Sequence, residues 1–231
     1  MSCLDESSLN PRYTIYDIRC TKKMTMKKSS LNKNKMNKKI VVGITGGLAT
    51  GKSVVADMLV KKGAVKIDVD SVGHRLLADD NNVKRMVTRI FGKGILSGEV
   101  IDRVKLRNIV FADKEKLEAL EGMLHPLMTG IVEEKIEAFK EGVLIIDAAL
   151  LVEMGLDKLT DIVVVVTAER AQQVERAVDR GISREEAEKI IDVQMPLSER
   201  IRFADHIIDN SSDIDTTKKG VNKLWKKIQN L

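Results

Sequence analysis

Residues 39–54 constrain the fold of this chain more than any other stretch of its sequence. The apolar, β-branched run at 40–44 is typical of a strand that is buried on both faces. Residues 46–53 follow directly and read G-G-L-A-T-G-K-S, which matches the spacing G-x-x-x-x-G-K-[ST]. Apolar residues then recur at helical spacing over 55–59. A strand, a glycine-rich turn and a helix in this order predict a loop that binds phosphate groups.

Each part of this loop has a chemical reason. Glycines let consecutive backbone N–H groups approach phosphate oxygens without obstruction by a Cβ atom. The helix that follows directs free N–H groups and the positive end of its dipole towards the anion. Lys52 could bridge the β- and γ-phosphates of a nucleotide, and the Ser53 hydroxyl could bind Mg²⁺. A chance match in an ordinary turn is disfavoured, because all four fixed positions are filled between a strand and a helix.

The composition limits the remaining classes of protein. A chain of 231 residues suits one domain, or one domain with an insertion. The longest purely apolar runs, such as 162–166, are too short to cross a bilayer, so no membrane partner is expected. The two cysteines, Cys3 and Cys20, have a spacing that suits neither a disulfide framework nor a zinc site. A reducing, cytoplasmic location is therefore predicted.

The positive charge of the chain is concentrated near its N-terminus. The formal net charge is +5, and residues 1–39 carry ten Lys/Arg against three Asp/Glu. The other 192 residues carry 29 basic and 31 acidic side chains, a net charge of −2. The folded part therefore gives little reason to expect nucleic acid as a partner.

Residues 1–38 are predicted to form a disordered, basic N-terminal extension. The segment 1–35 shows no apolar periodicity and ends in a stretch rich in Lys, Asn, Ser and Met. Because Met36 stands just before the first strand, our hypothesis is that 1–35 come from an upstream start assignment or are dispensable. A functional basic arm is the alternative. The folded domain is expected to span 39–231.

Strand-like and helix-like segments alternate through the rest of the chain. The later strands are expected at 64–68, 143–147, 162–166 and 204–209. Helices are expected over 71–140, with breaks at 91–94 and near 125–126, over 170–192 and over 213–231. This alternation predicts an α/β fold with a parallel sheet flanked by helices, as in P-loop NTPases. The long block at about 71–140 is interpreted as a helical insertion that could hold an acceptor.

Several carboxylates follow predicted strands, where α/β sheets place ligand-binding groups. Asp68 or Asp70 could accept the proton of an attacking hydroxyl group. The alternative is that this segment only caps the next helix, with Asp70 or Ser71 at the N-cap. Asp147 could hold Mg²⁺ or its bound water, or could equally cap a helix, and Glu153 is a weaker candidate for the same cluster.

Two arginines could supply positive charge to a transferred phosphoryl group. Arg176 and Arg180 are four residues apart, which would place them on one face of the helix predicted over 170–192. The alternative is an ordinary solvated face, since acidic residues flank both.

The three histidines, His74, His125 and His206, are scattered along the chain without metal-ligand spacing. The residues by themselves therefore favour a structural role for each of them.

Further short motifs follow the phosphate-binding loop in order. They are I-D-V-D (67–70), D-R (102–103), L-H-P-L (124–127), D-A-A-L-L-V-E-M-G-L-D (147–157), S-R-E-E-A (183–187), Q-M-P (194–196) and A-D-H-I-I-D-N-S (204–211). In this ordered combination the chain resembles the dephospho-CoA kinase family, from residue 39 to about 225. The loop is shared by many families, whereas the combination is far more specific.

The resemblance implies ATP-dependent phosphorylation of the ribose 3′-hydroxyl of dephospho-CoA, with Mg²⁺, to give coenzyme A and ADP. It implies that Asp70 is the general base and that the insertion at about 71–140 binds the acceptor. It also implies that about 167–192 form a lid, on which Arg176 and Arg180 contact phosphate.

The resemblance also assigns the remaining site residues. The implied ATP-binding residues are Gly46, Ala49, Thr50, Gly51, Lys52, Ser53, Val54 and Asn210. The implied acceptor contacts are Asp70, Arg75 and His125, and the implied catalytic residues are Asp70, Lys52, Arg176 and Arg180. Ser53, and Asp147 through water, are implied to hold the metal ion. The expected partner is dephospho-CoA, and a monomer is expected.

Two other functions stay open on the sequence. One is a related P-loop kinase that phosphorylates AMP, CMP or UMP, and the other is a nucleotide-binding regulatory protein without transferase activity. A GTPase switch is disfavoured, because the D-x-x-G at 70–73 follows the loop too closely and no N-K-x-D sequence is present.

Overall fold

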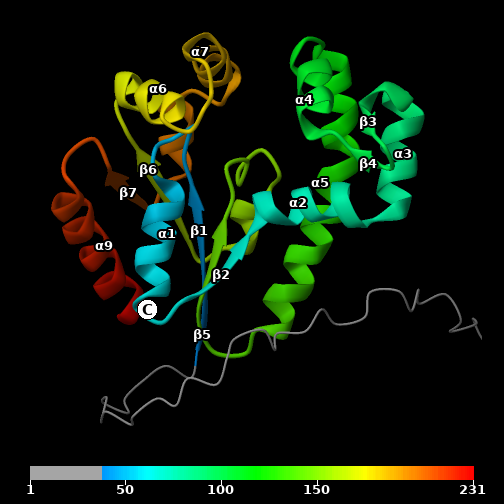
Figure 1. Cartoon of the computed structure of the whole chain (residues 1–231). Coiled ribbons are helices and arrows are strands. Elements are labelled where there is room, and N and C mark those ends of the chain that lie inside the picture. The colour runs from blue at the N-terminus through cyan, green and yellow to red at the C-terminus, as the bar shows by residue number, and fades with distance from the viewer. Residues whose placement is uncertain (1–37) are drawn as a thin grey trace, which may run out of the picture. The chain divides into compact units, whose positions relative to one another are not determined.

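Five parallel strands form the sheet on which the molecule is built (Figure 1). The computed structural model describes residues 38–231, so the predicted N-terminal extension lies outside the described residues apart from Lys38. The strands lie in the order β2-β5-β1-β6-β7. Their bounds are β1 Lys39–Thr45, β2 Val65–Asp68, β5 Gly142–Asp147, β6 Ile162–Thr167 and β7 His206–Asp209. All five predicted strands are confirmed, and so is the parallel α/β architecture.

Both faces of the central strands are buried, as their unbroken apolar sequence predicts. In β1, Val42 and Ile44 pack against the helices α1 (Lys52–Val60) and α9 (Ile214–Gln229). Val41 points to the other face, where its cluster includes residues of α2 (Val69–Asp79) and α5 (Lys114–Ala138). Successive side chains of the strand therefore point alternately into two hydrophobic cores, one on each side of the sheet.

The predicted insertion between β2 and β5 is mostly helical but contains a hairpin. Between α2 and α5 lie α3 (Asn81–Phe91), a 3₁₀ turn η1 (Lys93–Ile95), the strands β3 (Leu96–Ser97) and β4 (Val100–Ile101), and α4 (Arg103–Phe111). The predicted break at 91–94 is confirmed, because α3 ends at Phe91 and Gly92 has φ 81°. The hairpin was not predicted, since two residues per strand are too few to show a period of two.

The predicted break near 125–126 is wrong. Helix α5 runs through Pro126 without interruption. A proline lacks one N–H and its ring crowds the carbonyl four residues earlier. That earlier residue is Gly122, and apolar packing of Leu124, Met128 and Val132 holds the helix against the core. Burial of one helix face therefore outweighs a single lost hydrogen bond.

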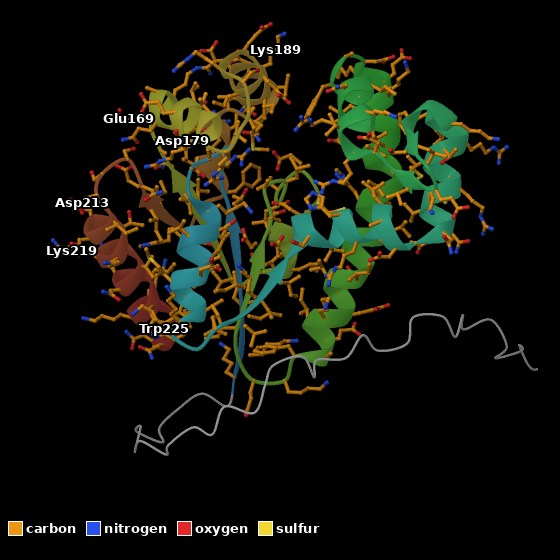
Figure 2. All side chains as sticks on the ribbon, viewed as in Figure 1. Glu169, Asp179, Lys189, Asp213, Lys219 and Trp225 are labelled. Carbon is orange, nitrogen blue, oxygen red and sulfur yellow. The ribbon has the colours of Figure 1, made fainter. Side chains whose placement is uncertain are left out.

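The helical segment predicted at 170–192 is two helices. Helix α6 (Arg170–Val178) and helix α7 (Arg184–Val193) are separated by a turn in which Gly181 has φ 86°. Ser183 starts α7 by accepting a hydrogen bond from the Glu186 N–H. The short helix α8 (Leu197–Arg200) and the 3₁₀ turn η3 (Ile201–Phe203) follow, and another 3₁₀ turn, η2 (Leu156–Leu159), precedes β6. Figure 2 shows Glu169, Asp179 and Lys189 on the outer surface of this region.

Membrane insertion was not expected from the sequence. Within residues 38–231, no helix is both long and apolar enough to cross a membrane.

Candidate active site

The glycine-rich loop connects the end of β1 to the start of α1. Its backbone turns sharply, with positive φ at Ala49 (54°) and Gly51 (93°). The Thr50 hydroxyl donates to the carbonyl of Gly47 at 3.0 Å, which closes the turn. Helix α1 then starts at Lys52 without a side-chain cap. Its first N–H groups are therefore free to bind an anion, as the sequence predicted.

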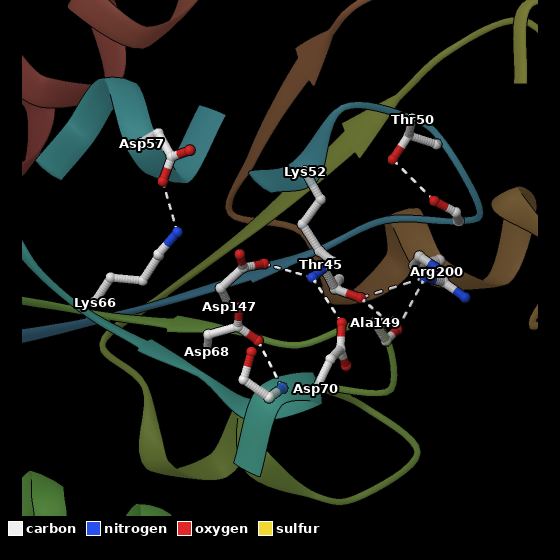
Figure 3. A network of polar contacts seen from close by, with 12 residues as sticks. Thr45, Thr50, Lys52, Asp57, Lys66, Asp68, Asp70, Asp147, Ala149 and Arg200 are labelled. Carbon is white, nitrogen blue, oxygen red and sulfur yellow. Dashed lines mark hydrogen bonds and ion pairs between the residues drawn. The ribbon is translucent and has the colours of Figure 1, made fainter. Parts of the chain in front are cut away.

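A lysine and two carboxylates meet below this loop (Figure 3). Lys52 Nζ lies 2.5 Å from Asp147 Oδ1 and 3.2 Å from Asp70 Oδ2. The Lys52 and Asp147 side chains are 10% and 1% exposed, whereas that of Asp70 is 47% exposed. The parallel pairing of β2 with β5 places Asp68 opposite Asp147, so the ends of these strands bring the carboxylates together. The structure therefore brings these candidate site residues together.

Burial and neighbouring charges shift the pKa values of Lys52 and Asp147 in opposite directions. Burial by itself would lower the pKa of Lys52, but the negative charges of Asp70 and Asp147 outweigh it and raise the pKa. Burial raises the pKa of Asp147, and the attraction of Lys52 offsets that rise only in part. Lys52 is therefore a fixed cation whose removal would leave a buried carboxylate without compensation.

Asp68, not Asp70 or Ser71, caps helix α2. An Asp68 carboxylate oxygen accepts a hydrogen bond from the Ser71 N–H at 2.9 Å, which corrects the predicted capping alternative. Asp68 is the N-cap residue because it is the last residue of β2 and has the extended backbone, φ −89° and ψ 102°, that an N-cap requires. Asp70 already lies inside the helix and has no capping bond to make. Its carboxylate is left free to face Lys52 and solvent.

The oxygen atoms near this cluster fit Mg²⁺ chemically. Asp147 Oδ2 is buried and has no hydrogen-bond partner within residues 38–231. The exposed Ser53 lies in the first turn of α1, next to Lys52. No group of three or more His, Cys, Asp or Glu side chains in the described part of the chain could hold a metal by itself. A small number of protein oxygens supplemented by nucleotide phosphates is the usual arrangement for Mg²⁺.

Glu153 does not join this cluster as the sequence suggested. Its carboxylate lies 3.4 Å from Nη2 of Arg200, a residue that the sequence reasoning missed. Arg200 is only 2% exposed and also donates to the Thr45 hydroxyl and the Ala149 carbonyl, at 3.3 and 3.2 Å. It ties the end of β1 to the segment after β5. A basic residue in a charged stretch gives no sequence signal of such burial.

Asn210 and Arg176 lie on the other side of the loop. The Asn210 amide donates to the Thr50 carbonyl at 2.8 Å and accepts from the Thr217 hydroxyl at 2.7 Å. Arg176 Nη2 donates to the Asn210 carbonyl at 2.9 Å, and its Nη1 is buried with no partner among the described residues. The structure thus brings Arg176 next to the loop through Asn210.

Arg180 does not share a helix face with Arg176, so that prediction is wrong. Helix α6 ends at Val178, and the Arg180 N–H donates to the Ala177 carbonyl in the turn that follows. The glycine at 181, with its positive φ, reverses the chain there. Arg180 is exposed and makes no recorded polar side-chain contact in the described structure.

The residues assigned to the acceptor fall in two places. Arg75 is exposed on α2 and lines a pocket of about 540 Å³. The other lining residues are Lys66, Ile67, Asp68, Ser71, His74 and Lys135. His125 is half-buried on α5 and does not line this pocket.

His74, for which the sequence favoured a structural role, follows Asp70 by one helical turn. Its Nε2 lies 2.6 Å from Nη2 of Arg103, the arginine of the D-R motif at the start of α4. Burial and the positive charge of Arg103 lower the pKa of His74. A guanidinium can only donate hydrogen bonds, so the ring nitrogen is the acceptor, and the contact joins α2 to α4.

Gln194 is another contact that the sequence reasoning did not single out. Its Oε1 accepts a hydrogen bond from the Leu48 N–H of the loop at 2.9 Å. The Q-M-P motif that contains Gln194 follows α7, so the segment after the predicted lid is fastened to the loop itself.

Comparison with known proteins agrees with this geometry. The family model for dephospho-CoA kinase matches residues 40–216. A dephospho-CoA kinase of Aquifex aeolicus is 40% identical over 81% of this chain and 96% of its own length. One of Fusobacterium nucleatum is 38% identical over 82% and 98%.

Solved structures show the same fold. A crystal structure from Thermus thermophilus superposes with a TM-score of 0.70 at 28% identity, covering 82% of this chain and 97% of the other. A dephospho-CoA kinase from Campylobacter jejuni, at 24% identity and with coverage of 84% and 98%, gives a TM-score of 0.61 and supports the fold. Sequence and structure together place this chain in the dephospho-CoA kinase family.

Proposed function

We propose that this chain transfers the γ-phosphoryl group of ATP to the ribose 3′-hydroxyl of dephospho-CoA, giving coenzyme A and ADP. The observation that carries the proposal is the Lys52–Asp70–Asp147 cluster directly below an uncapped, glycine-rich helix start. A phosphate-binding loop alone indicates a nucleotide and not a reaction. A half-exposed carboxylate within 3.2 Å of the loop lysine adds a group that can take a proton.

In this proposal the chain's own residues perform the transfer. The backbone of residues 46–54 binds the phosphates of ATP, and Lys52 neutralises charge on the transferred group. Asp70 orients the acceptor hydroxyl and takes its proton as the oxygen bonds to the γ-phosphorus and ADP leaves. Asp70 Oδ2 lies 3.2 Å from Lys52 Nζ, so the phosphate oxygens that Lys52 binds would compete with Asp70 for the ammonium group.

Ser53 and Asp147, the latter through water, would hold Mg²⁺. The ion would neutralise phosphate charge, which is the chemistry it supplies in such enzymes. The buried, unpartnered Oδ2 of Asp147 supports this assignment, because an acceptor oxygen buried without a donor is costly.

The subdomains keep the roles implied by the resemblance. Residues at about 71–140 would bind the acceptor, and those at about 167–192 would form a lid that carries Arg176 to the phosphates. The buried Nη1 of Arg176, which has no partner among residues 38–231, supports this phosphate-binding role. Arg180, in the turn after α6, is proposed to contact the phosphates as well. We also propose a cytoplasmic monomer whose partners are nucleotide and acceptor, and not membrane or nucleic acid.

Gly51 provides a test of the nucleotide site. A Cβ at this position would lie 2.1 Å from Asn210 Nδ2, in a backbone conformation that only glycine adopts readily. Gly51→Ala should therefore raise the Kd for ATP by about tenfold or more, since strained backbone costs about 1–3 kcal/mol. Calorimetric titration measures this. Gly63→Ala is the control, because Gly63 also has positive φ but nothing within 4 Å; equal losses would contradict the account.

Arg75 provides a test of the acceptor side. Its pocket carries the cationic side chains of Lys66, Arg75 and Lys135, which suit the diphosphate of dephospho-CoA. Arg75→Ala should raise the KM for dephospho-CoA about tenfold, given about 1.5 kcal/mol for a charged hydrogen bond, and change that for ATP much less. Steady-state kinetics with each substrate varied give both values. Lys226→Ala, on the exposed face of α9, is the control.

The reaction itself is tested by the choice of acceptor. ADP release with Mg-ATP should be stimulated strongly by dephospho-CoA and weakly by AMP, CMP or UMP. Stimulation by a monophosphate alone would make the chain a nucleoside monophosphate kinase. Binding of ATP without turnover for any acceptor would make it a regulatory protein.

A further inference from the structure

An ion pair links the lid to the acceptor insertion. Arg107 Nη2, on α4, lies 2.9 Å from Glu186 Oε1, on α7. The two side chains are 40% and 34% exposed, so the contact is partly shielded from solvent. Figure 1 shows α7 above the strand ends, between α6 and the α4 helix of the insertion.

The Glu186 carboxylate makes this ion pair in place of the hydrogen bond that it would make in a capping box at the start of α7. The sequence S-R-E-E at 183–186 has the spacing of a capping box, with Ser183 at the N-cap. Ser183 does accept from the Glu186 N–H, at 3.2 Å. In a complete box the Glu carboxylate would in turn bond the Ser183 N–H. Here the carboxylate instead meets a guanidinium 79 positions earlier in the chain.

Arg107 also has a buried hydrogen-bond donor without a partner. Its Nε is buried and has no hydrogen-bond partner within the described residues. An arginine that could turn freely to solvent would not leave a donor buried in this way. The guanidinium is therefore held by its contact with Glu186 and by the packing of α4, not by hydrogen bonds within its own subdomain.

The two elements carry opposite halves of the proposed reaction centre. The lid contains Arg176, and the insertion begins with α2, which carries Asp70. The contact between Arg107 and Glu186 therefore connects the two elements that carry the phosphate-binding and acceptor-binding groups. We propose that Arg107 and Glu186 are positioning residues, a clasp that holds the lid over the bound acceptor. This inference rests on the proposed function and adds a determinant of it.

Charge reversal tests the clasp. Arg107→Glu and Glu186→Arg should each lower kcat/KM for dephospho-CoA about three- to tenfold, because two like charges would then face each other across the clasp. The KM for ATP should stay within about twofold, since neither residue lies at the phosphate-binding loop. The double variant restores an ion pair of inverted polarity and should recover most of the lost activity.

The pair Arg170–Asp192 is a matched control. It joins α6 to α7 within the lid, at 2.8 Å, and does not reach the insertion. Arg170→Glu, Asp192→Arg and their double variant should all have wild-type kcat/KM. Thermal unfolding of every variant separates loss of the clasp from loss of the fold.

The outcomes distinguish the clasp from the proposed function. If the wild-type protein does not phosphorylate dephospho-CoA, the proposed function fails and the clasp fails with it. If the wild type is active but the reversed singles match it, or the folded double variant is as slow as the singles, the clasp alone is overturned. Equal effects from the Arg170–Asp192 series would also overturn it, because lid charge in general would then be responsible.

Discussion

Asp70→Asn is expected to lower kcat with dephospho-CoA by about 10²–10⁴-fold, the usual contribution of a general base. The affinity for ATP should stay near the wild-type value, because Lys52 keeps Asp147 as a partner and the loop backbone is unchanged. Single-turnover kinetics and a nucleotide titration measure the two effects separately. An equal loss of kcat and of ATP affinity would show that Asp70 has a structural role and is not the general base.

Asp68→Asn is the control for this experiment. Asp68 lies two residues earlier, and its carboxylate caps α2. Asparagine caps helices about as well as aspartate, so this variant should keep nearly full activity and stability. A loss at position 68 comparable to that at 70 would show that the assignment of the base is wrong.

Lys52→Met is expected to affect both catalysis and stability. Turnover should fall by about 10²–10³-fold, as when one charge-stabilising donor is removed from an active site. Asp147 is 1% exposed and would lose its cation, so the free energy of unfolding at neutral pH should fall by about 3 kcal/mol. Denaturant unfolding measures the second effect. The double variant Lys52→Met/Asp147→Asn should recover most of the stability and none of the activity.

The stability loss in Lys52→Met should depend on pH. Burial already raises the pKa of Asp147, and without Lys52 it would rise further. A carboxyl whose pKa is higher in the folded than in the unfolded state stabilises the fold below its unfolded value, 3.8, and loses that contribution as pH rises through the folded value. The variant should therefore be closest to wild-type stability near pH 4 and furthest from it at neutral pH.

Lys66→Met is the control for the buried pair. Lys66 also lies 2.5 Å from an aspartate, Asp57, but that carboxylate is 59% exposed. An exposed pair contributes roughly 0–1 kcal/mol, so this variant should change stability little. If Lys66→Met and Lys52→Met destabilise equally, burial is not the cause.

The sequence was sufficient for features encoded locally. The loop at 46–53 and the buried strands could be predicted because glycine spacing and unbroken apolar runs depend on neighbouring residues only. Asp70 and Asp147 come together because they follow or end the neighbouring strands β2 and β5, and parallel strands place their carboxyl ends at one edge, where the loop after β1 also positions Lys52.

Features that depend on tertiary packing were predicted poorly. Pro126 looked like a helix break, but the core packing of α5 overrides its local preference. Arg176 and Arg180 looked like one helix face, but α6 ends at Val178, before Arg180. The burial of Arg200 and the contact of Arg107 with Glu186 depend on residues that are far apart in the chain. No local sequence pattern predicts them.

The most direct test of the account is the identity of the product. Dephospho-CoA incubated with the protein and Mg-ATP, and followed by ³¹P NMR, should give ADP and one new phosphomonoester on the ribose 3′-oxygen, in equal amounts. Its appearance should be greatly slowed in both Lys52→Met and Asp70→Asn. ADP with inorganic phosphate and no phosphomonoester, or a phosphoryl group at another position, would contradict the assignment of acceptor and base.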